Sequence, residues 1–175
     1  MRTMERSFIL TIRKRIISAM LAVCMLLTLG SAAAATEAQA LQTSERGIAF
    51  IQNYESFSPT MYSSGGKWYI GYGTACDAGA YPDGITEEAA EALMLEALQT
   101  TEQQVNDFLQ QQNITCSQTQ FDALVSFTYT LGAEWMDPDY RFASCLIRGL
   151  SNCTDLEVVD AMVIWSHVGT AVDEH

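Results

Sequence analysis

The sequence predicts a mainly helical α+β domain with one small β-hairpin near its beginning. Extended runs flank a Gly-Gly pair at 65–66, and such a pair supplies the positive φ angles of a type I′ hairpin turn. Ser117 with Gln120, and Thr154 with Glu157, have the spacing of capping boxes, so each pair marks the start of a helix. The length of 175 residues suits one domain and a leader.

The first 40 residues have the pattern of a secretory signal peptide. Basic residues at 13–15 precede an apolar run at 16–30, and an A-x-A cleavage site follows at 38–40. The run is shorter than the roughly 20 residues that a membrane-spanning helix needs, and an uncleaved signal anchor is the alternative. We therefore expect no stable membrane span after cleavage and a domain of residues 41–175 that is secreted and extracellular.

The exported part is strongly acidic. Removing residues 1–40 leaves four basic and nineteen acidic side chains, a net charge of −15. Such a surface repels polyanions, so the sequence argues against a nucleic-acid partner.

Four cysteines remain after the leader, at positions 76, 116, 145 and 153. An even number in a secreted domain favours disulfides, with three possible pairings. A Cys145–Cys153 bond would close a short loop and leave Cys76 to pair with Cys116. A metal site is the rival explanation, but the chain has two histidines and neither C-x-x-C nor H-E-x-x-H. We expect no metal and no cofactor.

The first helix should place one carboxyl group among aromatic rings. Ser44 is a good N-cap, and Pro59 requires the helix to end before it. Glu55, between Tyr54 and Phe57, then lies at the C-terminal end, where the helix dipole and poor solvation both disfavour a charged carboxylate. A raised pKa suits a general acid at neutral pH. A plain surface glutamate is the alternative.

An aromatic ribbon follows the first helix. Trp68 and Tyr72 share one face of its second strand, and core packing is expected for both, whereas Tyr69 lies on the opposite face and can look into a cleft. The aromatic residues that could form stacking walls for a ligand are Trp68, Tyr69, Tyr72 and Trp135. Residues 77–84, with two glycines and a proline, are expected to form a loop.

Further helices occupy the rest of the chain. Thr86 should cap a long helix with an apolar stripe, long enough to bridge two lobes. The helix opened by Ser117 should end at Gly132 and, as the most apolar segment, form the buried centre. Asp139 is expected to cap a short helix that stops at Gly149, and the second capping box opens the last one.

Three motifs carry a resemblance to a known family. A glutamate at the end of a helix is followed by W-x-I-G-Y-G at 68–73, D-G-I-T-E-E-A-A-E-A-L at 83–93, and S-Q-T-Q-F-D-A-L-V-S-F-x-Y-x-x-G at 117–132. Over residues 44–165 the chain resembles the phage-type lysozymes, the endolysin family also called glycoside hydrolase family 24. The resemblance implies a lysozyme-like fold with a hairpin lobe, a helical lobe and a long joining helix. The family continues with another helix, which residues 41–175 are expected to lack.

The resemblance also implies an activity and a site. It implies a monomeric muramidase that hydrolyses the β-1,4 bond between N-acetylmuramic acid and N-acetylglucosamine in the glycan strands of peptidoglycan. In the family, the glutamate that ends the first helix is the general acid, while an aspartate or cysteine and a threonine position and activate the attacking water. The corresponding residues are Glu55, Ser64 and Tyr69 as candidate catalytic residues, with Tyr62, Tyr72 and Thr130 as candidate substrate-binding residues.

The absence of a second carboxylate at the expected position leaves three alternatives, because glycoside hydrolysis usually uses two. Ser64 or Tyr69 orients water without acting as a strong base. Asp77 or Glu134 supplies the carboxylate from elsewhere. Or the domain is a weakened or inactive module that binds peptidoglycan without cutting it.

Other hydrolase classes fit the sequence less well. A Cys-His amidase needs a free thiolate beside a histidine, and His167 is the one internal histidine. A serine hydrolase is disfavoured because G-x-S-x-G is absent.

Overall fold

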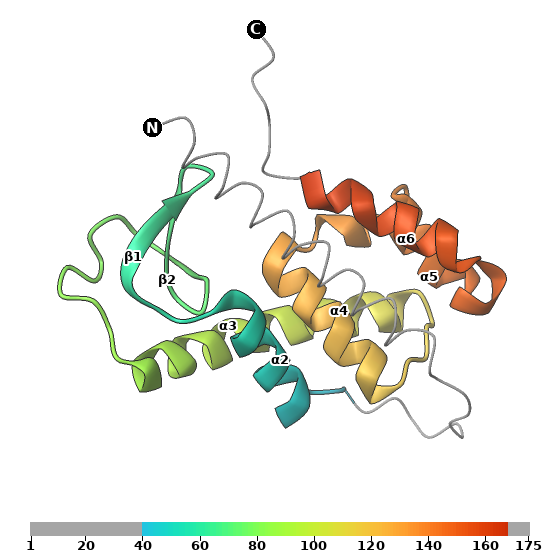
Figure 1. The fold of residues 1–175 in the computed structure, drawn as a ribbon. Helices are drawn as coiled ribbons and strands as arrows, with labels where there is room; N and C mark the ends of the chain where they lie inside the picture. The colour runs from blue at the N-terminus through green and yellow to red at the C-terminus, as the bar shows by residue number, and fades with distance from the viewer. Residues whose placement is uncertain (1–39, 168–175) are drawn as a thin grey trace, which may run out of the picture.

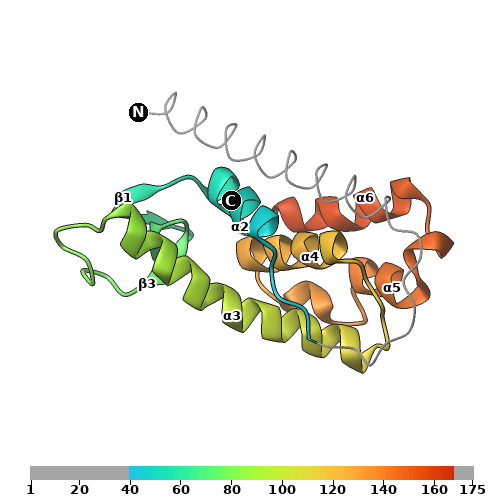
Figure 2. The ribbon, with the colours of Figure 1, turned by 90° about the horizontal axis from the view of Figure 1, so that it is seen from below.

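A computed structural model describes residues 40–167. The predicted leader lies outside this range except for Ala40. The prediction that a final helix is lacking also falls on residues outside it. The described part places a small sheet at one side and a group of helices at the other, and α3 (Glu87–Gln111) runs from one to the other (Figures 1 and 2). This is the predicted α+β arrangement.

The sheet has three antiparallel strands in the order β1 (Ser58–Ser64), β2 (Lys67–Gly71) and β3 (Thr74–Cys76). The turn between β1 and β2 confirms the predicted hairpin, since its two glycines have φ angles of 58° and 77°. The sequence did not predict β3, whose three residues are too few to show an alternating pattern. The loop predicted at 77–84 contains no helix or strand.

The two aromatic residues expected to share a core-facing side of β2 do not do so. Tyr72 is buried, at 6% exposure, and packs on Phe57, whereas Trp68 is 39% exposed. Gly71 lies between them with φ +63°, a left-handed conformation that ends the strand and breaks its alternation. The expectation of core packing is therefore confirmed for Tyr72 and wrong for Trp68.

Two helices form the junction with the sheet. The first, α2 (Glu45–Glu55), begins at the predicted cap, where the Ser44 side chain accepts a hydrogen bond from the backbone N–H of Gly47. Thr86 caps α3 in the same way, as predicted. Because α3 packs on both β2 and α4 (Gln118–Leu131), it connects the sheet lobe to the helical lobe.

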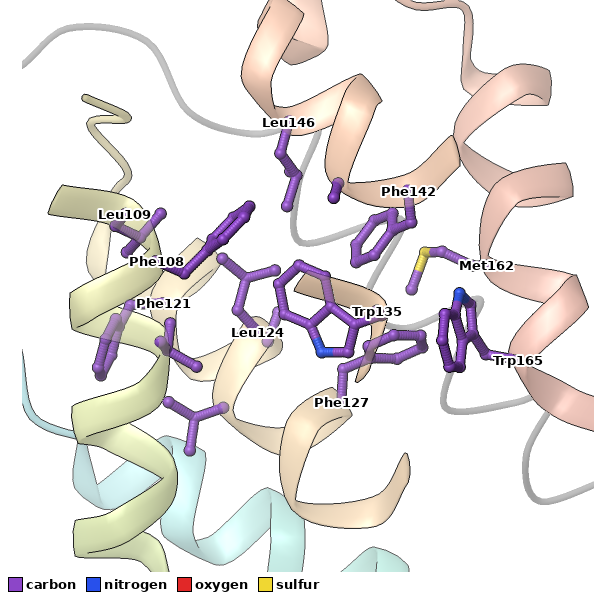
Figure 3. Packing of buried hydrophobic residues seen from close by; sticks show 14 of the residues in the cluster. Phe108, Leu109, Phe121, Leu124, Phe127, Trp135, Phe142, Leu146, Met162 and Trp165 are labelled. Atoms are coloured by element: carbon purple, nitrogen blue, oxygen red, sulfur yellow. The ribbon is translucent and has the colours of Figure 1, made fainter. Parts of the chain in front are cut away.

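The buried centre of the helical lobe is α4, as predicted. Its capping box forms between Ser117 and Gln120, and Gly132 ends it with φ +85°. Figure 3 shows the surrounding core, in which Trp135 lies among the rings of Phe108, Phe127 and Phe142. Trp135 has 0% exposure, so it belongs to the core and is not a stacking wall for sugars.

Short elements complete the helical lobe. They are η1 (Glu134–Met136), α5 (Arg141–Arg148), η2 (Leu150–Asn152), α6 (Asp155–Val163) and η3 (Ile164–His167). Gly149 ends α5 and the Thr154–Glu157 capping box opens α6, as predicted. The prediction that Asp139 caps α5 is wrong, because Tyr140 occupies the N-cap without a side-chain bond. The backbone N–H of Asp139 instead donates to the carboxylate of Asp137, 2.9 Å away.

The predicted disulfides are not formed. The four described cysteines are free thiols. Cys76 ends β3 in the sheet lobe, whereas Cys116 lies beyond the C-terminal end of α3, so these two are separated along a long helix (Figure 2). Cys145 and Cys153 are neighbours, and the Sγ of Cys153 lies 3.7 Å from the Cys145 carbonyl oxygen.

Among residues 40–167, we find no helix that combines the length and the apolar character required to cross a bilayer.

Candidate active site

The C-terminal end of α2 brings Glu55 against the end of α4. The hydroxyl of Thr130 donates a hydrogen bond to Oε1 of Glu55 over 2.7 Å. On the other side of the carboxyl group, a Cβ built on Gly73 would lie 3.1 Å from Oε2. The end of α2, the end of α4 and the turn between β2 and β3 therefore meet at this half-buried carboxyl group.

The position of Glu55 follows from how α2 is held at both ends. At its start, the backbone N–H and the hydroxyl of Ser44 donate to the two carboxylate oxygens of Asp122 on α4, over 2.9 and 2.5 Å. At its end, Ser56 adopts φ +61°, which turns the chain away directly after Glu55. A left-handed conformation is uncommon for serine and stops the helix at this residue.

Tyr129 joins the turn after β2 to α4. Its hydroxyl donates to the carbonyl oxygen of Tyr72 over 2.8 Å and lies 3.3 Å from the hydroxyl of Thr74. Burial raises the pKa of Tyr129 to about 12, and the nearby charges of Glu55 and Tyr62 act in the same direction. The phenol is therefore neutral near pH 7 and serves as a hydrogen-bond donor.

Two further tyrosines stack on the ribbon beside the carboxyl group. Tyr62 and Tyr69 pair across β1 and β2, and their ring centroids are 5.7 Å apart with an interplanar angle of 26°. Burial raises the pKa of Tyr62, followed by the proximity of Glu55, then Tyr69 and Cys76. Tyr62 is therefore within range of the charge of Glu55, and the residue is 38% exposed.

Of the predicted site residues, Thr130 contacts Glu55, and Tyr62 is near enough for the charge of Glu55 to raise its pKa. Tyr69 stacks on Tyr62. Ser64 is exposed at the hairpin tip, paired with Lys67 and on the same strand face as Tyr62, two residues away. The ring of Tyr72 is in the core, and its hydroxyl donates to Glu87 over 2.8 Å.

The proposed substitutes for the second carboxylate, Asp77 and Glu134, are both exposed. Asp77 is exposed just after β3, where it contributes to the raised pKa of the Cys76 thiol behind the larger effect of burial. Glu134 is exposed at the start of η1. The charge of Glu55 raises the pKa of both Tyr62 and Tyr129. Neither Asp77 nor Glu134 is among the groups that raise these two pKa values.

Sequence reasoning missed Gly73 and Tyr129. Both lie inside motifs that were recognised, at the last glycine of W-x-I-G-Y-G and at the tyrosine of the α4 motif. Their motif positions were the available signal, but the contacts depend on how α4 packs against the sheet lobe.

The fold is that of the lysozyme-type glycoside hydrolases. Residues 52–173 match the family described as phage lysozyme, and the chain belongs to this family. Family membership groups the protein with the peptidoglycan hydrolases, which act at the cell wall or outside the cell.

Two solved structures are similar to the chain. The muramidase domain of SpmX from Asticaccaulis excentricus is 28% identical with a TM-score of 0.57, over 71% of this chain and 79% of that one. An endolysin from Escherichia coli O157:H7 phage FAHEc1 is 23% identical with a TM-score of 0.52, over 78% of this chain and 97% of that one. Both confirm the predicted lysozyme fold. No protein with a curated description matches the sequence.

Proposed function

We propose that the protein is a muramidase that cleaves the β-1,4 bond between N-acetylmuramic acid and N-acetylglucosamine, with Glu55 as the general acid. The observation that carries this proposal is the Glu55 carboxyl group, held by Thr130 at the junction of the sheet and helical lobes. A fixed carboxyl group between two lobes suits a glycan strand that lies along the junction and presents one bond to it.

Glu55 protonates the oxygen that leaves with N-acetylglucosamine. As the bond from this oxygen to C1 of the muramic acid breaks, positive charge develops on C1 and the ring oxygen. The carboxylate that remains then stabilises that charge from a short distance. Because Tyr62 is held neutral, its hydroxyl group can donate a hydrogen bond beside the carboxylate without adding negative charge. The hydroxyl hydrogen of Tyr129 is already donated to the carbonyl oxygen of Tyr72.

The stacked pair of Tyr62 and Tyr69 provides the sugar-binding surface. Aromatic faces bind the apolar faces of sugar rings, and the Tyr62 ring is sufficiently exposed for such contact. Ser64, on the same strand face, supplies a hydroxyl group at the hairpin tip. The substrate is the glycan strand, and the protein acts on it as a monomer after removal of residues 1–40.

A second candidate is a module that binds peptidoglycan without cutting it. The observation that favours it is the replacement of the expected water-activating residues by Ser64 and Tyr69. General-base help is worth about a hundred- to ten-thousandfold in rate, so its loss could reduce hydrolysis to a negligible level.

The test compares clearing of a peptidoglycan suspension by the wild-type protein and by the Glu55→Gln variant. We expect the variant to lose activity by about a hundred- to ten-thousandfold and to retain binding to pelleted peptidoglycan. Glu45→Gln is the matched control, since it removes an exposed carboxylate from the opposite end of the same helix. Equal rates for wild type and Glu55→Gln would reject Glu55 as the acid. Binding without clearing by the wild type would select the second candidate.

A further inference from the structure

Several of the side chains that interact with Glu55 carry hydroxyl groups. Thr130 donates to the carboxyl group, Tyr62 and Tyr129 lie within electrostatic reach of it, and Ser64 shares a strand face with Tyr62. Aliphatic hydroxyls are very weak bases at neutral pH, and the raised pKa values of Tyr62 and Tyr129 keep those phenols protonated. None of these four side chains can take a proton from water efficiently, and the hydroxyl of Tyr129 is already bound to the carbonyl oxygen of Tyr72.

We propose that the protein cleaves its substrate by intramolecular transglycosylation, in which the C6 hydroxyl of the muramic acid replaces water as the nucleophile. The product is a strand that ends in a 1,6-anhydromuramic acid. This inference rests on the proposed muramidase function and concerns the fate of the same broken bond. It requires one carboxyl group from the protein, and the structure supplies Glu55.

The atoms balance without a co-reactant. Glu55 gives its proton to O4 of the departing N-acetylglucosamine, and the electron pair of the C1–O4 bond leaves with that oxygen. The C6 hydroxyl oxygen then forms a bond to C1, and its proton passes to the Glu55 carboxylate. Glu55 returns to the protonated form, and the sum of the products has the same composition as the substrate.

The stereochemistry explains why one carboxyl group is sufficient. In a β-linked muramic acid, C6 lies on the same ring face as the leaving oxygen, so the new bond forms on the face from which the old one departed. The donor of the first proton is therefore also the nearest acceptor of the second. Meanwhile, the 2-acetamido oxygen of the sugar can stabilise C1 from the opposite face, as in substrate-assisted glycosidases.

The hydrogen bond from Thr130 supports both steps. A donor 2.7 Å from Oε1 stabilises the carboxylate that remains after the first proton transfer and fixes its plane. The second oxygen, Oε2, lies on the side of Gly73. Because glycine has no side chain, this oxygen does not meet the methyl group that an alanine would place 3.1 Å away.

Magnitudes favour the intramolecular nucleophile at this site. Hydrolysis without a general base loses about a hundred- to ten-thousandfold in rate. A well-oriented nucleophile in the same molecule reacts as if present at roughly 10⁵–10⁸ M, which far exceeds the concentration of bulk water. The stacked rings of Tyr62 and Tyr69 add bulk to the ribbon face beside Glu55 without adding a base that activates water.

The test identifies the products by mass spectrometry. The wild-type protein is incubated with purified peptidoglycan strands in heavy-oxygen water. We expect new ends lighter than a reducing muramic acid by the mass of one water and free of heavy oxygen. Reducing ends that carry heavy oxygen would overturn this inference and leave the muramidase function intact. No new ends of either kind would reject both proposals.

Two aspartate variants provide an internal comparison. Ser64→Asp places a carboxylate on the strand face of Tyr62, whereas Ser63→Asp adds the same charge on the opposite face. We expect Ser64→Asp to raise the ratio of reducing to anhydro ends by about tenfold or more, because it supplies a base for water. Ser63→Asp should leave the ratio unchanged. The inference would be contradicted if the wild-type protein produced mainly reducing ends and if both variants gave the same ratio of reducing to anhydro ends as the wild type.

Discussion

At the scale of single residues, the two oxygens of Glu55 are held differently. Thr130 donates a hydrogen bond to Oε1, while Oε2 lies against the open space left by Gly73. Both neighbours come from segments distant in sequence from α2. Each can be changed with a closely matched control, so the contribution of each side can be measured separately.

Thr130→Val removes the hydrogen bond to Glu55 at nearly constant volume. We expect the cleavage rate to fall by about tenfold, consistent with a charge-assisted hydrogen bond worth roughly 1.5–3 kcal/mol that is partly replaced by water. The alkaline limb of the pH profile should move to higher pH, because a donor to a carboxylate favours its charged form and removal of the donor favours the acid. Thr130→Ser retains the hydroxyl group, so a pH profile altered in both variants would contradict this role.

Gly73→Ala introduces a methyl group 3.1 Å from Oε2 of Glu55, at a residue with φ +80°. We expect lower stability, by about 1–2 kcal/mol from the left-handed backbone, together with a large loss of activity from displacement of the carboxyl group. Gly79→Ala separates the two effects, since Gly79 has φ +78° and nothing within 4 Å of an added Cβ. Thermal unfolding and cleavage rates are measured for both. Equal loss of activity in the two variants would show that strain alone is responsible.

At the scale of elements, the four residues before α2 are tied to the helical lobe. Asn106 on α3 accepts from the backbone N–H of Leu41 over 3.0 Å and donates to its carbonyl oxygen over 2.8 Å. The backbone N–H of Thr43 donates to Glu102 over 2.7 Å, and Ser44 is bound by Asp122. The segment directly after the predicted cleavage site is therefore part of the fold and fixes the start of α2.

Asn106→Ala should loosen this segment. The variant removes both bonds to Leu41 and leaves partly buried backbone groups unpaired, so we expect a loss of about 1–3 kcal/mol in the free energy of unfolding. Urea denaturation followed by circular dichroism measures it. Gln103→Ala on the exposed side of α3 is the control, because its 3.5 Å contact with Asp107 contributes little. Equal urea midpoints for Asn106→Ala and Gln103→Ala would show that the bonds to the segment before α2 do not stabilise the domain.

The capping box of α6 predicts a dependence of stability on pH. Hydrogen bonds donated by the backbone N–H and the side chain of Thr154 lower the pKa of Glu157 below its usual 4.5. A lowered pKa in the folded state adds stability that is complete above the unfolded pKa and is lost as pH falls through the folded one. The stability difference between wild type and Glu157→Gln should therefore be largest near pH 7 and shrink below about pH 4. A difference that is constant from pH 7 to pH 3 would contradict the charge effect.

Local signals predicted the helices well because their determinants lie within one turn. The Ser117 and Thr154 boxes gave helix starts that the structure confirms. Errors arose where a neighbour changed the local pattern: Gly71 interrupts the alternation between Trp68 and Tyr72. The cap of α5 was misplaced by one residue, because Asp139 has the composition of a cap without its geometry.

The candidate site was only partly predictable for a related reason. Glu55 was found from its helix-end position and aromatic neighbours, which are local in the sequence. The bond from Thr130 joins residues 75 apart, so it depends on the packing of α2 against α4. The sequence alone could not show this contact, so Thr130 was predicted to bind the substrate and not to contact Glu55.

At the scale of the whole molecule, the net charge of the chain and the junction between its lobes contribute differently to the binding of a wall polymer. The full chain carries a net charge of −12, and the part after the predicted leader carries −15. Binding to a wall polymer that is itself negative must then rely on short-range contacts at the junction of the lobes. Electrostatic steering, which accelerates many charged encounters, works against this protein at long range.

Binding to peptidoglycan should therefore resist salt. Raising the ionic strength from about 0.01 M to 1 M shortens the Debye length from roughly 30 to 3 Å, which screens long-range repulsion but leaves stacking and hydrogen bonds in place. We expect the fraction of Glu55→Gln protein that pellets with peptidoglycan to stay constant or to rise over this range. The inactive variant is used so that the polymer is not consumed, and polymer stripped of anionic side chains is the control. A steep fall in binding with salt would mean that a local basic surface dominates recognition, despite the overall acidity of the chain.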